Sequence, residues 1–271
     1  MFVLDTITHR LRQGCQTMAY PAGPPPALPE RHGGSLRVEA AKCADGCSAC
    51  APVCPTQAIT RPTGSTVALD LGRCLFCASC VEACPNGAIT QTRDHRMAVR
   101  RRDDLVLGRA GEEELRLAAA LDAKLLQLFG RSLRLRQVSA GGCNACEADT
   151  NVLGTIGWDL GRFGIQFVAS PRHADGLLIT GPVTQNMRLA LEKTYAAVPS
   201  PKIVIAVGAC AIAGGPFVGH PQVHDGAGAV VPVDLFIPGC PPHPLTILDG
   251  LLRLLGRLPR EEDSRLVKTG L

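Results

Sequence analysis

Cysteine constrains this chain more than any other residue type, because thirteen occur among 271 residues and twelve of them stand in regular patterns. The twelve form three groups of four. The groups are Cys43, Cys47, Cys50 and Cys54; Cys74, Cys77, Cys80 and Cys84; and Cys143, Cys146, Cys210 and Cys240. A disulfide scaffold would also be rich in cysteine, but the tight spacing and the lack of a secretory signal favour free thiolates that bind metal.

The second group reads C-x2-C-x2-C-x3-C-P from Cys74 to Pro85. This is the spacing of bacterial ferredoxins, in which the fourth cysteine of each run ligates the cluster of the other run. Three thiolates on a tight loop wrap three corners of an iron–sulfur cubane, and the proline redirects the chain. We therefore assign one [4Fe–4S] cluster to Cys74, Cys77, Cys80 and Cys54.

The first group repeats this pattern with one extra residue, since CSACAPVCPTQAIT matches CASCVEACPNGAIT. We expect Gly46 to absorb the insertion as a bulge, because glycine tolerates a positive φ. The second [4Fe–4S] cluster is then assigned to Cys43, Cys47, Cys50 and Cys84. Paired CxxC units also suit tetrahedral zinc, which stays open as an alternative.

The third group lies in a part of the chain that alternates between strand-like and helical patterns. Strands are expected at residues 133–138, 165–170, 176–180, 202–207 and 233–237, and helices at 149–160, 184–197 and 244–257. This alternation predicts an α/β fold: a flavodoxin-like, mostly parallel sheet with helices on both faces. Ligands of such folds sit beyond the carboxyl ends of the strands, where these four cysteines fall. One four-thiolate cluster is the simplest interpretation.

The domain organisation follows from these patterns. An N-terminal arm (1–35), irregular over residues 16–35, precedes a small α+β ferredoxin-like domain (36–100) with two clusters. A linker with a bridging helix over residues 115–129 (101–131) leads to the α/β domain (132–258), and a polar tail (259–271) ends the chain.

Composition excludes some classes of function. A net charge of +4 is too small for a nucleic-acid-binding surface. The longest apolar run, residues 203–218, is broken by glycine and proline and is too short to span a membrane. Asp5 stands where a signal peptide would be positive. We expect a soluble protein in a reducing, cytoplasmic compartment.

The stretch GGCNACEAD…ITGPVTQNM…VGACAIAGGPF…FIPGCPPHP resembles the small subunit of energy-converting [NiFe] hydrogenases, over about residues 133–257. It is also similar to the related complex I subunit that carries the last cluster before quinone. The N-terminal part, from MFVLDTITHRLRQG to LGRCLFCASCVEACP, is similar to the two-cluster ferredoxin subunit of formate hydrogenlyase. The chain thus looks like a fusion of two neighbouring subunits.

The resemblance implies that Cys143, Cys146, Cys210 and Cys240 hold the cluster nearest a Ni–Fe site in a separate large subunit, so that no catalytic residue lies in this chain. It implies membrane subunits as further partners and an electron donor such as a formate dehydrogenase or a ferredoxin. The protein would be peripheral on the inner face of the cell membrane. Glu147 and Asp149 are candidates for a proton relay; the alternative is that an acidic residue here caps a helix.

Three alternatives stay open. A complex I-like quinone oxidoreductase without Ni–Fe uses a related subunit, although that subunit typically opens its motif with two adjacent cysteines, and the Cys143-x2-Cys146 spacing favours the hydrogenase branch. A structural zinc scaffold would have no redox role. A free-standing ferredoxin would leave the second domain without a use. Cys15 is isolated and is not assigned as a ligand.

Overall fold

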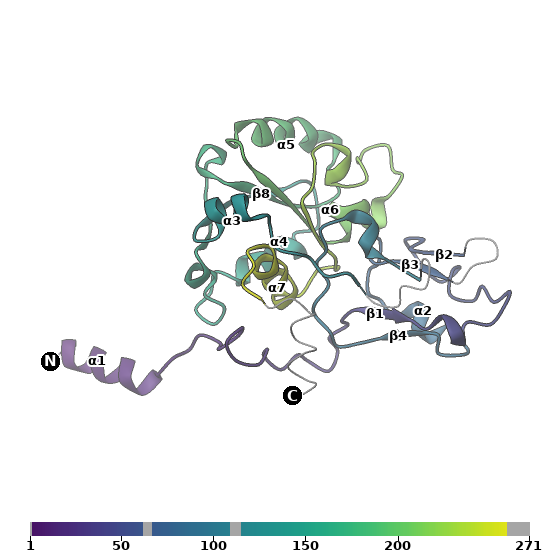
Figure 1. The fold of residues 1–271 in the computed structure, drawn as a ribbon, viewed down its shortest axis with the longest axis horizontal. Coiled ribbons are helices and arrows are strands. Elements are labelled where there is room, and N and C mark those ends of the chain that lie inside the picture. The colour runs from purple at the N-terminus through teal and green to yellow at the C-terminus, as the bar shows by residue number, and fades with distance from the viewer. Residues whose placement is uncertain (1, 62–66, 109–114, 259–271) are drawn as a thin grey trace.

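The computed structural model describes residues 2–61, 67–108 and 115–258, and the predicted polar tail (259–271) lies outside these residues. Two bodies are visible in Figure 1: an α/β domain built around β8, and a smaller domain that carries β1 to β4. None of the helices within the described ranges has the length and apolar character needed to cross a bilayer.

The α/β domain contains five parallel strands in the order β10-β9-β8-β6-β7. They are β6 (Leu133–Ser139), β7 (Ile165–Phe167), β8 (Gly176–Thr180), β9 (Ile203–Val207) and β10 (Leu235–Ile237). Every residue of β8 and β9 is buried. Continuous apolar runs of this kind are typical of strands covered on both faces, which confirms the predicted parallel sheet.

Helices cover both faces of the sheet. They are α3 (Ala123–Phe129), α4 (Ala145–Val152), α5 (Gln185–Ala197), α6 (Ala209–Ala213) and α7 (Pro244–Leu254). Successive residues of a strand point to opposite faces. Leu177 of β8 accordingly packs in the cluster that contains Leu191 of α5, and Leu178 packs with α7 and Phe129 of α3. In Figure 1, α5 lies on the side of the sheet away from α7.

The smaller domain consists of two short antiparallel sheets. One pairs β1 (Leu36–Val38) with β4 (Ile89–Gln91), and the other contains β2 (Ile59–Thr60), β3 (Ala68–Asp70) and β5 (Val106–Leu107). The short helix α2 (Ser79–Glu82) lies in the second cysteine run. So little regular structure offers a small core, and we expect bound metal to supply much of the missing stability.

The two domains share a continuous interface. Val99 and Phe236 of β10 exchange two backbone hydrogen bonds of 2.9 and 3.0 Å, so that the chain leaving the small domain pairs with the edge of the large sheet. Arg100 Nε donates to the carbonyl of Asp234 over 2.8 Å. Both domains also contribute to one buried apolar cluster. The relative position of their cysteines is therefore fixed by packing.

The N-terminal arm ties the domains together from the other side. Met18 N–H donates to Gly157 O, and Arg162 donates to the carbonyls of Met18 and Tyr20. Farther along, Gly34 N–H donates to Thr92 O in the small domain. Ahead of the arm, α1 (Phe2–Gln13) projects away from the rest of the molecule (Figure 1) and exposes an apolar stripe. The stripe is Val3, Leu4, Ile7 and Leu11.

The bridging helix is shorter than predicted. Only α3 (Ala123–Phe129) is helical, and Asp122 caps it by accepting the N–H of Leu125. Residues 115–122 have no helix, because their backbone bonds to other parts of the fold: Ala118 N–H donates to Ala98 O and Leu121 N–H to Leu254 O. The helix expected at 149–160 begins earlier, at Ala145, and ends at Val152.

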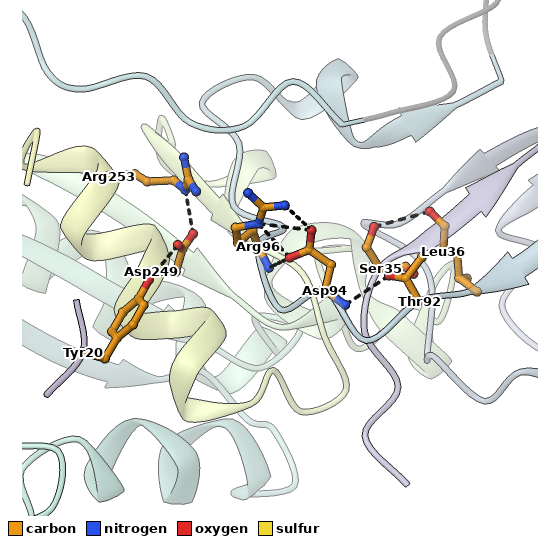
Figure 2. A network of polar contacts seen from close by, with 8 residues as sticks. All are labelled: Tyr20, Ser35, Leu36, Thr92, Asp94, Arg96, Asp249 and Arg253. Carbon is orange, nitrogen blue, oxygen red and sulfur yellow. Dashed lines mark hydrogen bonds and ion pairs between the residues drawn. The ribbon is translucent and has the colours of Figure 1, made fainter. Parts of the chain in front are cut away.

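A buried polar network fixes the arm to α7 (Figure 2). Tyr20 donates its hydroxyl hydrogen to Asp249 Oδ1 over 3.2 Å, and Arg253 Nε donates to Asp249 Oδ2 over 2.7 Å. Burial and the Asp249 carboxylate raise the pKa of Tyr20, so its hydroxyl stays protonated and donates. Asp249 is therefore the acceptor that compensates the buried Arg253 charge.

The substitution Asp249→Ala should lower the free energy of unfolding by about 3–5 kcal/mol, because it leaves the Arg253 guanidinium buried without a partner. The side chains of the pair are only 9% and 1% exposed. Denaturant unfolding of the purified protein measures the loss.

The matched control is Glu192→Ala, which breaks the exposed pair of the same spacing between Arg188 and Glu192. That change should cost only about 0.3–0.5 kcal/mol. Equal effects of the two substitutions would show that the buried network does not stabilise the fold.

Candidate metal centres

The first site lies between the two cysteine runs of the small domain. A narrow pocket is lined by Cys43, Cys47, Cys50 and Cys84 together with mostly small and apolar side chains. Burial raises the pKa of the Cys50 thiol, and the other three thiols of the set add to this shift. Gly46 has φ +74°, which confirms the bulge expected at the inserted residue. The structure thus brings together the four cysteines that the sequence assigned to one cluster.

The second site contains the other four cysteines of the small domain: Cys54, Cys74, Cys77 and Cys80. Burial raises the pKa of the Cys74 thiol to about 12, and the remaining three thiols of this set raise it further. Burial likewise raises the pKa of Cys80 to about 11, helped by Cys54 and Cys77. These mutual effects require that the four sulfurs lie close to one another. Cys54 of the first run thus lies near the thiols of the second run, and its assignment as a ligand of that site stays a prediction.

Backbone N–H groups point at several of these sulfurs. Ala58 N–H donates to Cys54 Sγ and Ala88 N–H to Cys84 Sγ, each over 3.2 Å, at equivalent positions of the internal repeat. Phe76 N–H donates to Cys74 Sγ over the same distance. Such bonds stabilise negative charge on a ligating sulfur. Although burial opposes the shift, the N–H groups of residues 86–89 lower the pKa of the Cys84 thiol.

The C-terminal site contains Cys143, Cys146, Cys210 and Cys240, at the carboxyl ends of three parallel strands. Cys143 lies in the loop after β6 and Cys146 in the first turn of α4, while α6 after β9 carries the third and the loop between β10 and α7 carries the fourth. Burial raises the pKa of the Cys210 thiol to about 11, and the thiols of Cys240 and Cys143 contribute. Cys143 and Cys240 are exposed, so this site lies at the protein surface.

Two glycines leave room for the sulfurs of this site. A Cβ atom at Gly208 would lie 2.5 Å from Cys146 Sγ, and one at Gly215 would lie 2.7 Å from Cys210 Sγ. Both glycines also have positive φ values, of +90° and +55°. Only glycine, which has no Cβ atom, readily adopts this backbone conformation so close to a sulfur atom.

The three sets fit iron–sulfur cubanes better than single ions. Four neighbouring thiolates repel one another, so a set of four cannot all ionise unless a cationic group lies between them. Within residues 2–61, 67–108 and 115–258, no three Cys, His, Asp or Glu side chains lie close enough to hold one metal ion. A [4Fe–4S] cluster takes four thiolates. Four cysteine donors in each set therefore suit a cluster of this kind.

The sites follow one another through the molecule. The thiol of Cys50 in the first site also raises the pKa of Cys80 in the second. A further cavity of about 290 Å³ is lined by Leu75 and Phe76, which lie between Cys74 and Cys77 in the sequence, and by Cys240 of the C-terminal site. The order is thus first, second and C-terminal site.

The two acidic candidates have different surroundings. Glu147 is buried, and its Oε1 accepts from Ser139 Oγ over 2.5 Å and from Thr180 Oγ1 over 2.6 Å. These hydroxyls end β6 and β8, so Glu147 joins α4 to the sheet. Asp149 is half-buried in the wall of the cavity that Phe76 and Cys240 also line, and burial raises its pKa. A joint proton relay of the two residues stays a prediction.

Two family descriptions match separate parts of the chain. "NADH ubiquinone oxidoreductase, 20 Kd subunit" matches residues 143–254, which include the whole C-terminal site. "4Fe-4S dicluster domain" matches residues 38–88, which include all eight cysteines of the other two sites.

Curated relatives come from several kinds of oxidoreductase complex. The "Probable membrane-bound hydrogenase subunit mbhJ" of Pyrococcus furiosus is 42% identical over 138 residues, which are 51% of this chain and 83% of the relative. Formate hydrogenlyase subunit 7 of Escherichia coli is 43% identical over 54% of this chain and 58% of its own length. A subunit of the NADH-quinone oxidoreductase of Clostridium beijerinckii is 42% identical over 44% of this chain and 73% of its own length.

The close approach at Gly208 predicts a selective loss of metal. Gly208→Ala should displace Cys146 and lower the iron content of anaerobically purified protein by about four atoms per chain. Iron analysis together with cluster absorption measures the change. Gly228→Ala is the control, because a Cβ at Gly228 meets no atom within 4 Å. Full iron content in Gly208→Ala would show that the site does not need glycine at this position to make room for Cys146 Sγ.

Proposed function

Because this chain belongs to the family of the 20 kDa subunit of NADH ubiquinone oxidoreductase, we propose that it transfers electrons through three [4Fe–4S] clusters within a hydrogenase-like or complex I-like oxidoreductase. The observation that carries the proposal is the gathering of twelve cysteines into three sets of four, placed one after another. The chain relays electrons, and bond-making chemistry belongs to a partner protein.

The residues of the chain divide this work among them. Bound clusters would supply reversible one-electron transfer. The twelve cysteines bind them: the first site, the second site and the C-terminal site as defined above. The backbone N–H groups at Ala58, Phe76 and Ala88 stabilise charge on the ligating sulfurs. The shared core and the pairing of Val99 with Phe236 hold the sites at fixed separation.

The hydrogenase branch is our preferred assignment. The Cys143-x2-Cys146 spacing supports it, as does similarity to subunits of a membrane-bound hydrogenase and of formate hydrogenlyase. In this assignment the C-terminal site faces a large subunit with a Ni–Fe centre, and its exposed Cys143 and Cys240 suit such a contact. Membrane subunits anchor the complex on the inner face of the membrane, and a formate dehydrogenase or a ferredoxin supplies electrons to the small domain.

A second candidate is the cluster-bearing subunit of a complex I-like quinone oxidoreductase without Ni–Fe. The 42% identity to the NADH-quinone oxidoreductase subunit of Clostridium beijerinckii favours it. Metal analysis of the co-purified large subunit separates the two candidates: about one nickel per complex supports the hydrogenase, and a nickel-free complex that reduces quinone supports the alternative.

The cluster number is tested by iron analysis and electron paramagnetic resonance (EPR) spectroscopy of anaerobically purified protein. We expect about twelve irons per chain and three reducible clusters. Cys240→Ser should remove the signal of one cluster and leave two. Cys15→Ser is the matched control, because Cys15 is exposed and belongs to none of the three sites. Stoichiometric zinc without iron, or an iron content near eight, would contradict the proposal.

A further inference from the structure

One serine side chain points at a ligand of the second site. Ser79 Oγ lies 3.4 Å from Cys77 Sγ, which is within the distance of a hydrogen bond to sulfur. A cysteine that binds metal is a thiolate and has no hydrogen to donate. The serine hydroxyl is therefore the donor of this pair. Cys77 is exposed and Ser79 is half-buried, so the bond lies on the outer side of the site.

The turn between the two residues brings the hydroxyl back to the sulfur. Ala78 has φ 62° and ψ 0°, a left-handed conformation that residues with a Cβ atom rarely adopt. Ser79 follows directly and is the first residue of α2. Its side chain makes no other hydrogen bond within the part of the chain that the structure describes. The hydroxyl therefore serves this one sulfur.

The other half of the internal repeat lacks this bond. When CSACAPVCP is aligned with CASCVEACP, Ala49 takes the position of Ser79 and Ser48 takes that of Ala78. Ser48 is exposed, its φ is not positive, and its hydroxyl bonds to none of the described residues. The hydroxyl donor is thus a property of the second site that the repeat does not give to the first.

Thr56 carries the other hydroxyl near a ligand of the second site, but its hydrogen is used elsewhere. Its Oγ1 lies 3.8 Å from Cys54 Sγ and donates to the carbonyl of Arg73 over 2.8 Å. A hydroxyl has one hydrogen, and the shorter bond to the carbonyl oxygen takes it. Among the residues that the structure describes, Ser79 is therefore the one whose hydroxyl is free to donate to a sulfur of the three sites.

We propose, on the basis of the function proposed above, that the Ser79 hydroxyl makes the cluster of the second site easier to reduce. Reduction adds one electron, whose charge spreads onto the ligating sulfurs, and the O–H···S bond stabilises that added charge. The electron comes from the cluster of the first site. Ser79 keeps its proton, and no covalent bond forms or breaks. The hydroxyl thus raises the reduction potential of the cluster in the middle of the relay.

A different group acts on the first site. Arg61 donates to the carbonyl of Cys47 and, over 3.2 Å, to the carbonyl of Ala44. A positive charge near a cluster also favours its reduced form, because reduction adds negative charge. The order of the potentials in the two sites depends on both groups. The effect of Ser79 is therefore measured within its own site, by comparing variants with the unmodified protein.

The test is a redox titration of the full cluster-loaded chain, followed by EPR spectroscopy. Comparison with Cys77→Ser, which lacks one ligand of the second site, identifies the signal of that cluster. In Ser79→Ala the ratio of reduced to oxidised cluster at a fixed potential should fall about tenfold. For a one-electron couple this is a downward shift of about 59 mV. The other two clusters should keep their potentials.

Further variants separate the hydroxyl from the shape of the side chain. Ser79→Thr keeps the hydroxyl and should keep the potential. Ser79→Val has nearly the shape of the threonine variant without the hydroxyl, so it should behave like Ser79→Ala; it also serves as the second variant should the alanine variant lose its cluster. Ser48→Ala is the control and should leave all three potentials unchanged, because Ser48 bonds to no sulfur.

An unchanged potential in Ser79→Ala or in Ser79→Val, with the cluster retained, would overturn the proposal. A shift in Ser79→Thr or in Ser48→Ala as large as that in Ser79→Ala would overturn it as well, because the shift would then not follow this hydroxyl. Absence of iron from the second site of the unmodified protein would instead overturn the proposed function.

Discussion

The structure depends on one electrostatic constraint: four cysteine thiols lie near one another at each of three places, and burial at each place opposes the charge of at least one of them, namely Cys50, Cys74 and Cys210. Burial raises the pKa of the Cys74 thiol to about 12 and that of the Cys210 thiol to about 11, and it raises the pKa of Cys146 further still. A cationic cluster reverses this balance, because it binds the thiolate and not the thiol. We therefore expect metal binding and folding of the small domain to be coupled, because its short strands offer only a small core.

The scaffold places these sites by two different means. In the small domain an internal repeat exchanges one cysteine between two similar loops, so each site needs both halves. In the α/β domain the carboxyl ends of parallel strands bring together residues from loops that are up to about a hundred positions apart in the chain. The pairing of Val99 with Phe236 and the arm that passes Tyr20 then hold the two arrangements in one body.

Much of this arrangement follows from the sequence, because its signals are local. The cysteine spacing predicted the two sites of the small domain, and the apolar run at residues 176–180 corresponds to β8 without any shift. The wrong predictions concern segments whose conformation depends on contacts with residues far away in the sequence. Residues 115–122 have helical spacing, yet tertiary backbone bonds to Ala98 and Leu254 hold them in another conformation. Ser139 and Thr180 are polar residues at strand ends. That was the only signal in the sequence for their hydrogen bonds to Glu147.

Anomalous diffraction at the iron absorption edge, from crystals grown without oxygen, tests the central claim most directly. The account predicts three separate iron clusters per chain, each surrounded by the four sulfurs of one of the sets named above. Fewer than three iron sites, isolated single ions, or a cluster bound by cysteines of a different set would contradict it.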